Sequence, residues 1–223
     1  MRGATAVFTL RTFCFASVAL FASSTVADFN VTTLAGGGSQ TNGVGTNVGF
    51  GATGGIAAHN GTVFVADYYY GLIRTITSDG IVSTLAGQNS GAGYGANYGA
   101  GNGACLQSSF FWPWGIALDL PSGKIYVADA GNNLIRIISM TPTCIVSTLA
   151  GSGAAGFADG SPGIFNYPTG VALGIDNTVY VADSRNNRVL CHLTAPYAHL
   201  LARLQSEVHL LLTTSGIYTL IMP

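Results

Sequence analysis

The stretch Ile125-Tyr126-Val127-Ala128-Asp129 decides the fold, because the chain contains it three times. It returns with small changes over residues 63–67 as Val-Phe-Val-Ala-Asp and over residues 179–183 as Val-Tyr-Val-Ala-Asp. Alternate side chains of a β-strand point to opposite faces, and here neither alternate set is polar. Each copy therefore predicts a strand that is buried on both faces.

Two further phrases recur around this strand in the same order. An aromatic residue followed by a Gly-Ile-Ala or Gly-Val-Ala run precedes it, over residues 50–57, 110–117 and 165–172. A Thr-Leu-Ala-Gly phrase ends at Gly36, Gly87 and Gly151. Three phrases in a fixed order predict three structural repeats.

Each repeat contains four short runs of β-branched or aromatic residues separated by turn residues, which predicts a four-stranded antiparallel meander. The third strand is expected over residues 72–76 and 134–138. Asn60-Gly61 between the first two strands is a strong hairpin signal. Strands buried on both faces need neighbouring sheets on both sides, so we expect an all-β fold, a β-propeller of three four-stranded antiparallel blades forming a half or incomplete ring. A two-sheet sandwich is the alternative.

The repeats resemble the NHL-repeat β-propeller family. Residues 127–136 carry the resemblance, with Asn133-Leu134-Ile135 and Asn187-Arg188-Val189 at the position of the family's Asn-His-Leu signature. The resemblance covers residues 31–190 and implies the fold. It says little about function, because such propellers include RNA-binding modules, an extracellular amidating lyase, adhesion proteins and sensor domains. The chain departs from the family in three ways. Gly71 replaces the signature Asn in the first repeat, and Leu190 replaces the Arg of the third strand in the third repeat. The usual ring has six blades, whereas three repeats are seen here.

The chain is expected to divide into three parts. Residues 1–27 read as a signal peptide, with two early Arg residues, an apolar run and small residues before Asp28. Residues 28–190 hold the blades, the first over about 54–87, the second over about 113–151 and the third from about 168. Residues 191–223 diverge; residues 198–212 suit a short helix and 215–220 a degenerate fourth strand, or the whole end is unrelated to the repeat.

Composition narrows the function. Only 8% of residues are charged and the net charge is -1, so the clustered Lys and Arg of a nucleic-acid-binding surface are lacking. The apolar run over residues 12–22 is too short for a membrane span, so we expect a secreted chain with no span after cleavage; an uncleaved anchor is the alternative. Asn30 and Asn60 stand in glycosylation sequons. Cys105 and Cys144 are expected near opposite faces and are not predicted to form a disulfide.

A ligand site is expected on the face formed by the turn after the second strand and the connector before the first. Loops on a rigid scaffold commonly bind ligands, and aromatics with amides suit a sugar or peptide. The candidate ligand-binding residues are Tyr68, Tyr69, Tyr70, Trp112, Trp114, Asn132, Asn133, Arg185 and Asn186, with Tyr94 and Tyr98 in a connector. The alternative is that Trp112 and Tyr167 only pack between blades.

No catalytic set emerges from the sequence. Asp67, Asp129 and Asp183 occupy equivalent positions at strand ends, where we expect structural turn caps that accept backbone hydrogen bonds. Only His59 lies within the repeats, so we expect no metal and no cofactor. The prediction is a non-enzymatic module that binds a protein or glycan; the alternatives are a metal-dependent extracellular propeller enzyme and an incomplete propeller. We also expect a homodimer in which residues 31–36 complete the partner's last blade.

Overall fold

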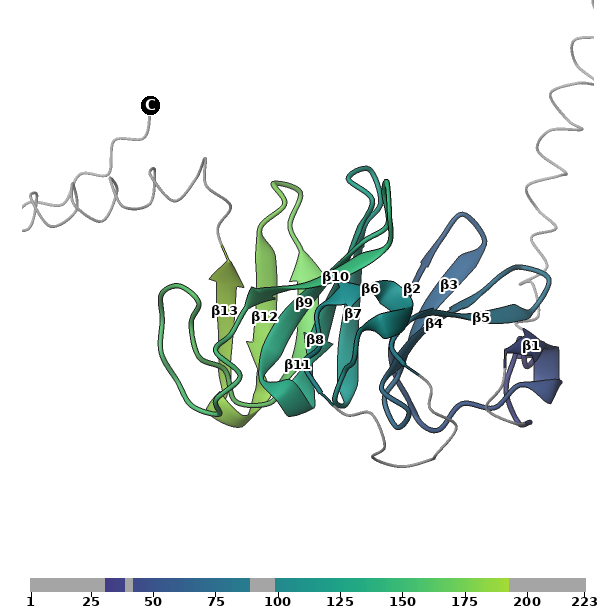
Figure 1. Cartoon of the computed structure of the whole chain (residues 1–223), viewed down its shortest axis with the longest axis horizontal. Coiled ribbons are helices and arrows are strands. Elements are labelled where there is room, and N and C mark those ends of the chain that lie inside the picture. Colours follow the sequence, from purple (N-terminus) through teal and green to yellow (C-terminus); the bar gives the residue numbers. More distant parts are fainter. Residues whose placement is uncertain (1–30, 39–41, 89–98, 193–223) are drawn as a thin grey trace, which may run out of the picture. The chain divides into compact units, whose positions relative to one another are not determined.

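The computed structural model describes residues 31–38, 42–88 and 99–192 and places them in three antiparallel sheets (Figure 1). The sheets follow one another along the chain. The first contains β1 (Gly43–Val44), β2 (Thr53–His59), β3 (Thr62–Asp67), β4 (Leu72–Ile76) and β5 (Ile81–Ala86). The second contains β6 (Gly103–Ala104), β7 (Pro113–Asp119), β8 (Lys124–Asp129), β9 (Leu134–Ser139) and β10 (Ile145–Ala150). The third contains β11 (Pro168–Leu173), β12 (Val179–Asp183) and β13 (Arg188–His192).

The strand order confirms the predicted meander. In the first sheet the order is β1-β5-β4-β3-β2, and in the second it is β6-β10-β9-β8-β7, so consecutive long strands pair. The expected third strand over residues 72–76 is β4. Asn60 and Gly61 both have positive φ, +46° and +75°, as a two-residue hairpin turn requires.

The core lies between the sheets. Phe64 and Ala66 of β3 pack with Val127 of β8 in one buried cluster. On the other face of β8, Ala128 packs with Val181 of β12 in a second cluster. A strand that contacts a sheet on each side buries both alternate sets of side chains, which explains why the Val-Ala-Asp strands show no apolar–polar alternation.

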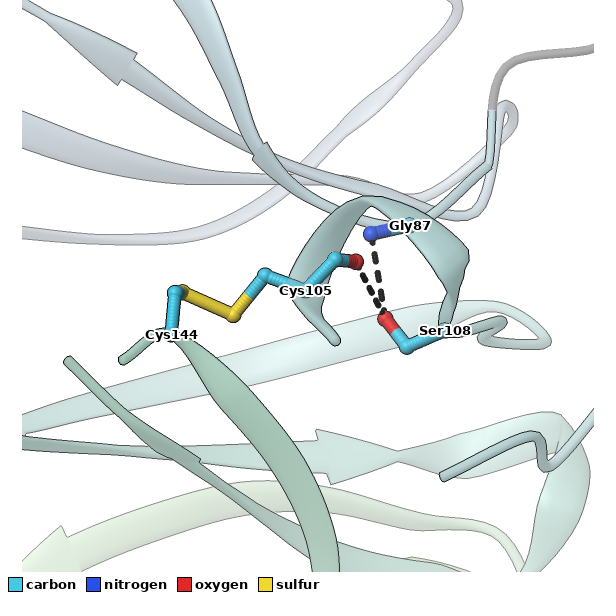
Figure 2. Close-up of a disulfide and its surroundings, with 4 residues drawn as sticks. All are labelled: Gly87, Cys105, Ser108 and Cys144. Atoms are coloured by element: carbon cyan, nitrogen blue, oxygen red, sulfur yellow. Dashed lines mark hydrogen bonds between the residues drawn. A yellow bond between two sulfur atoms is a disulfide. The ribbon is translucent and has the colours of Figure 1, made fainter. Parts of the chain in front are cut away.

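A disulfide joins Cys105 to Cys144, and the prediction that they do not pair is wrong. The two-residue strand β6 adds to the outer edge of β10, with Ala104 opposite Ile145. This pairing brings Cys105 beside Cys144, and the Cys105 amide donates to the Cys144 carbonyl at 3.0 Å. The Ser108 hydroxyl, which donates to the Cys105 carbonyl, accepts a hydrogen bond from the Gly87 amide, so the bridge also anchors the end of β5 (Figure 2).

The leading segment, residues 31–36, forms no strand in the single chain. Its expected place in the last blade of a partner stays a prediction. Contacts divide the chain between Thr33 and Leu34, and most of the first unit lies outside the described residues. Several sequence predictions also lie outside them: the signal peptide, the 198–212 helix, the 215–220 strand, Asn30, Tyr94 and Tyr98. Within the described ranges no helix is long and apolar enough to cross a membrane.

Candidate functional site

The three equivalent aspartates hold the connector that enters each blade. Asp67, Asp129 and Asp183 are fully buried. Each Oδ1 accepts a backbone hydrogen bond from the residue after the repeated Phe: the Gly51, Phe111 and Asn166 amides donate at 3.1, 2.8 and 2.7 Å. The predicted local caps are therefore long-range ties, since each donor lies 16 to 18 residues earlier in the chain.

Two arginines that the sequence reasoning did not single out complete these ties. Arg74 pairs with Asp67 at 3.1 Å and Arg136 pairs with Asp129 at 2.8 Å, with all four side chains fully buried. The identical spacing of seven residues from Asp to Arg in both repeats was the available signal. Burial is the largest influence on the pKa of Asp129 and raises it to about 6, against the lowering effects of its hydrogen bonds and of Arg136.

The asparagines at the strand turns also belong to the scaffold. Asn132 donates to the Gly99 carbonyl at 2.7 Å and to Asp129 at 2.8 Å. Asn186 donates in the same way to Gly156 and Asp183. The donors of these two amides thus serve internal acceptors, and their expected ligand-binding role stays a prediction.

Asn133 has a similar scaffolding role between blades. Its own backbone is left-handed, and its Oδ1 accepts a hydrogen bond from the Tyr167 amide at 2.8 Å. Its Nδ2 donates to the Gly153 carbonyl. The Asn133 side chain thus fixes the backbone of Tyr167, the residue that precedes the first strand of the next blade, and its ligand-binding role stays a prediction.

Four aromatic side chains contact one another near the blade turns. The Tyr68 ring stacks on Trp112 with centroids 5.8 Å apart and meets Trp114 edge-on at 5.0 Å. Trp112 in turn contacts Tyr167 edge-on at 6.2 Å. We call Tyr68, Trp112, Trp114 and Tyr167 the aromatic cluster.

The local backbone explains why the aromatic cluster forms. Trp112 and Tyr167 occupy the same repeat position, directly before the proline that begins β7 or β11, and both have positive φ, +56° and +55°. Left-handed backbone is costly for bulky residues and often accompanies functional sites. In the first repeat this position is Ala52. Tyr68, from the turn after β3, lies where Ala130 and Ser184 stand in the other repeats, and its ring reaches the next blade.

Polar groups border the aromatic cluster. The Tyr68 and Tyr167 hydroxyls lie 3.5 Å apart, and the Arg185 guanidinium lies 4.4 Å from the centre of the Tyr167 ring. Burial, and then the hydrogen bond with Tyr68, raise the pKa of Tyr167 to about 12. The Trp112 indole Nε1 is buried without a hydrogen-bond partner, whereas Trp114 is 40% exposed. The cluster thus combines accessible ring surface with hydrogen-bonding groups and a cation.

The other predicted residues lie outside the cluster's contacts. Tyr69 and Tyr70 meet edge-on at 5.4 Å, and both lie against Gly51 of their own blade. Tyr167, in contrast, belongs to the cluster; from the sequence it was considered only in the alternative that it and Trp112 pack between blades, although both precede a proline. His59 is exposed at the end of β2, and the described residues bring no three His, Cys, Asp or Glu side chains together as metal ligands.

Antiparallel four-stranded sheets that pack face to face through doubly buried strands are blades of a β-propeller. The NHL repeat family matches residues 110–138 and 165–191, so the second and third blades carry NHL repeats. "NHL repeat-containing protein 2" of Bos taurus is 31% identical over 133 residues, which is 57% of this chain. The human protein of that name is 29% identical over the same length. The chain covers 18% of the length of these curated relatives.

Solved structures share the fold. A protein of unknown function from Bacteroides thetaiotaomicron superposes with a TM-score of 0.51 at 22% identity, over 57% of this chain and 31% of that one. An auxiliary nutrient binding protein from the same species gives a TM-score of 0.51 at 20% identity, over 60% of this chain and 35% of its own. At these identities the likeness concerns architecture.

Proposed function

We propose that the chain is a secreted, non-enzymatic binding module that holds a protein or glycan ligand on its loop face. The observation that carries this proposal is the aromatic cluster. Its members come from the turn after β3, from the connectors before β7 and β11, and from the start of β7, so three blades contribute to one surface. Residues on different rigid sheets can hold a ligand without reorganising, which lowers the entropic cost of binding.

The chemistry of the cluster suits a ligand with a flat apolar face edged by polar groups. Aromatic rings stack on such faces, and the exposed Trp114 ring is available for that contact. The Trp112 Nε1 lacks an internal acceptor, so a small backbone movement would let it donate to a ligand oxygen. Sugars and proline-containing peptides both present this combination of faces and acceptors.

Three features of the chain support secretion: a disulfide, a glycosylation sequon and a signal-like first segment. The Cys105–Cys144 disulfide is of the kind that persists outside the cytosol. The Asn60 sequon lies in an exposed hairpin turn, where a glycan can be attached without disturbing the core. Together with the signal-like residues 1–27, these features favour an extracellular glycoprotein.

The test is a binding screen with paired variants. The full chain, collected from the medium of eukaryotic cells, is applied to a glycan array and to an array of displayed extracellular domains. Trp114→Ala should weaken any hit about fivefold or more, because one stacked ring contributes at least about 1 kcal/mol. Phe157→Ala is the matched control, since Phe157 is 45% exposed but lies outside the cluster. A hit that survives Trp114→Ala and Trp112→Phe, or a stoichiometric metal in the purified protein, would contradict the proposal.

A further inference from the structure

Two edges of the described chain are complementary. In the first two blades the third strand pairs with a fourth, β4 with β5 and β9 with β10. Within the described ranges β13 pairs only with β12, so its other edge carries no strand. Residues 33–36, in contrast, carry the Thr-Leu-Ala-Gly sequence of a fourth strand, and no described strand lies beside them as a third strand.

A cavity lies next to the free edge of β13. Its volume is about 350 Å³. The side chains that define it include Phe165, Val179, Val181, Val189, Leu190 and Cys191. Between the first two blades the corresponding space is filled, because the fully buried Val146 of the fourth strand β10 packs there in the cluster that contains Phe110 and Val127. The cavity therefore lies at the position that a valine of the fourth strand, equivalent to Val146, would occupy.

Gly36 already has the geometry of a fourth-strand end. Its φ is +123°, and its amide donates to the Gly45 carbonyl at 3.2 Å. At the ends of β5 and β10, Gly87 and Gly151 have φ of +97° and +102°, and each amide donates in the same way to the following connector. Gly36 stands 17 residues before β2, as Gly151 stands 17 residues before β11. Residues 34–36 thus lie against the first blade as the end of a preceding blade would.

We propose that residues 31–36 of a second copy of this chain add to β13 as its fourth strand. Two three-bladed chains then close one six-bladed ring through two identical strand exchanges. The pairing of Ile138 with Val146 in the second blade sets the register and places Val31 of the second copy opposite His192. Val31 is 99% exposed in the single chain, and in the ring it fills the cavity that corresponds to the seat of Val146. This inference does not depend on the ligand proposed above.

The mass in solution tests the proposal. Light scattering after size exclusion of the full chain should give twice the chain mass. Val31→Asp should weaken association roughly 100-fold or more, because the strand exchange would bury an unpaired carboxylate, while the circular dichroism of the blades stays unchanged. Leu106→Asp is the control, since Leu106 is exposed on the 3₁₀ helix η2 (Cys105–Gln107), away from both edges, and should leave the dimer intact. A folded wild-type monomer at micromolar concentration would overturn the proposal.

A cross-link tests the register. By analogy with Ile137 opposite Ser147, Cys191 of one copy faces Thr32 of the other, at a separation of about 5 Å between Cβ atoms. Mild oxidation of Thr32→Cys should give a covalent dimer that disappears when Cys191 is changed to Ser. Thr33→Cys is the matched control, because its side chain leaves the strand on the opposite face. Thr32→Cys alters the Asn30 sequon and Thr33→Cys does not, so both variants also carry Asn30→Gln. Equal cross-linking by both variants, or none by Thr32→Cys, would refute this strand exchange.

Discussion

The buried pair of Arg136 and Asp129 offers the sharpest test of how the blades are held together. Arg136→Met keeps the apolar stem of the side chain but removes the guanidinium. Nη1 donates to Asp129 at 2.8 Å and to the Ser109 carbonyl, and Nη2 donates to the Gly101 carbonyl and to Asn102 at 2.7 Å. All of these interactions are lost together.

The expected loss follows from the burial of both partners. Each side chain has 0% exposure, so the variant leaves Asp129 as a buried charge without a counter-ion, which costs about 3–5 kcal/mol. Urea unfolding at pH 7 measures the loss, and the melting temperature should fall by roughly 10 °C for a domain of this size. The penalty should shrink at pH 5, where Asp129, whose pKa is about 6 even beside Arg136, takes up a proton. Arg188→Met, at an exposed position on β13, should cost under about 1 kcal/mol and serves as the control.

The reasoning would be refuted by a loss under about 1 kcal/mol at pH 7 for Arg136→Met, or by a loss equal to that of Arg188→Met. A penalty that is the same at pH 5 and pH 7 would show that the missing hydrogen bonds, rather than the unpaired carboxylate, set the cost.

Three further predictions use the disulfide and the shifted pKa values. Replacing Cys105 and Cys144 together by Ala should lower the free energy of unfolding by about 4 kcal/mol in urea, because their separation of 39 residues closes a long loop in the unfolded chain. In an ultraviolet titration, the tyrosine that ionises near pH 12 should vanish in Tyr167→Phe and persist in Tyr180→Phe. Folding raises the pKa of Asp129, so its contribution to the free energy of unfolding is complete below pH 4 and falls by about 3 kcal/mol as the pH rises past 6. Asp129→Asn should abolish this pH dependence in urea unfolding.

The repeats in the sequence predicted the blades because the long strands of each blade carry a recognisable sequence pattern. The Val-Ala-Asp strand and the Leu-Ile strand after it each span five or six residues, and their repeated sequences predicted β3, β4, β8 and β9. The disulfide escaped because β6 is only two residues long and carries no pattern. Its pairing with β10 alone brings Cys105 across to Cys144.

The sequence predicted at which end of the blades the candidate residues lie, but not which atoms they contact. The chain order of the strands placed Tyr68, Trp112 and Trp114 at one end of the blades, and the structure brings these three rings together. The amides of Asn132 and Asn186 could not be distinguished from ligand-binding groups, because their acceptors are carbonyls of glycine-rich connectors 30 or more residues earlier. Such acceptors are backbone atoms, which leave no trace in residue type.

The third blade concentrates its departures on β13, and they are physically related. Where Arg74 and Arg136 stand in the first two blades, β13 carries Leu190, so Asp183 keeps its backbone and Asn186 donors but faces no arginine among the described residues. Leu190 instead lines the cavity beside the free edge. In the first two blades the arginine ties the blade to its own connector, whereas in the third blade the apolar Leu190 lies beside a strand edge with which no described strand pairs. The apolar lining and the edge of β13 suit the fourth strand proposed from a second copy. Such a strand places a valine in the cavity and forms backbone hydrogen bonds with the edge, and neither interaction requires an arginine at position 190.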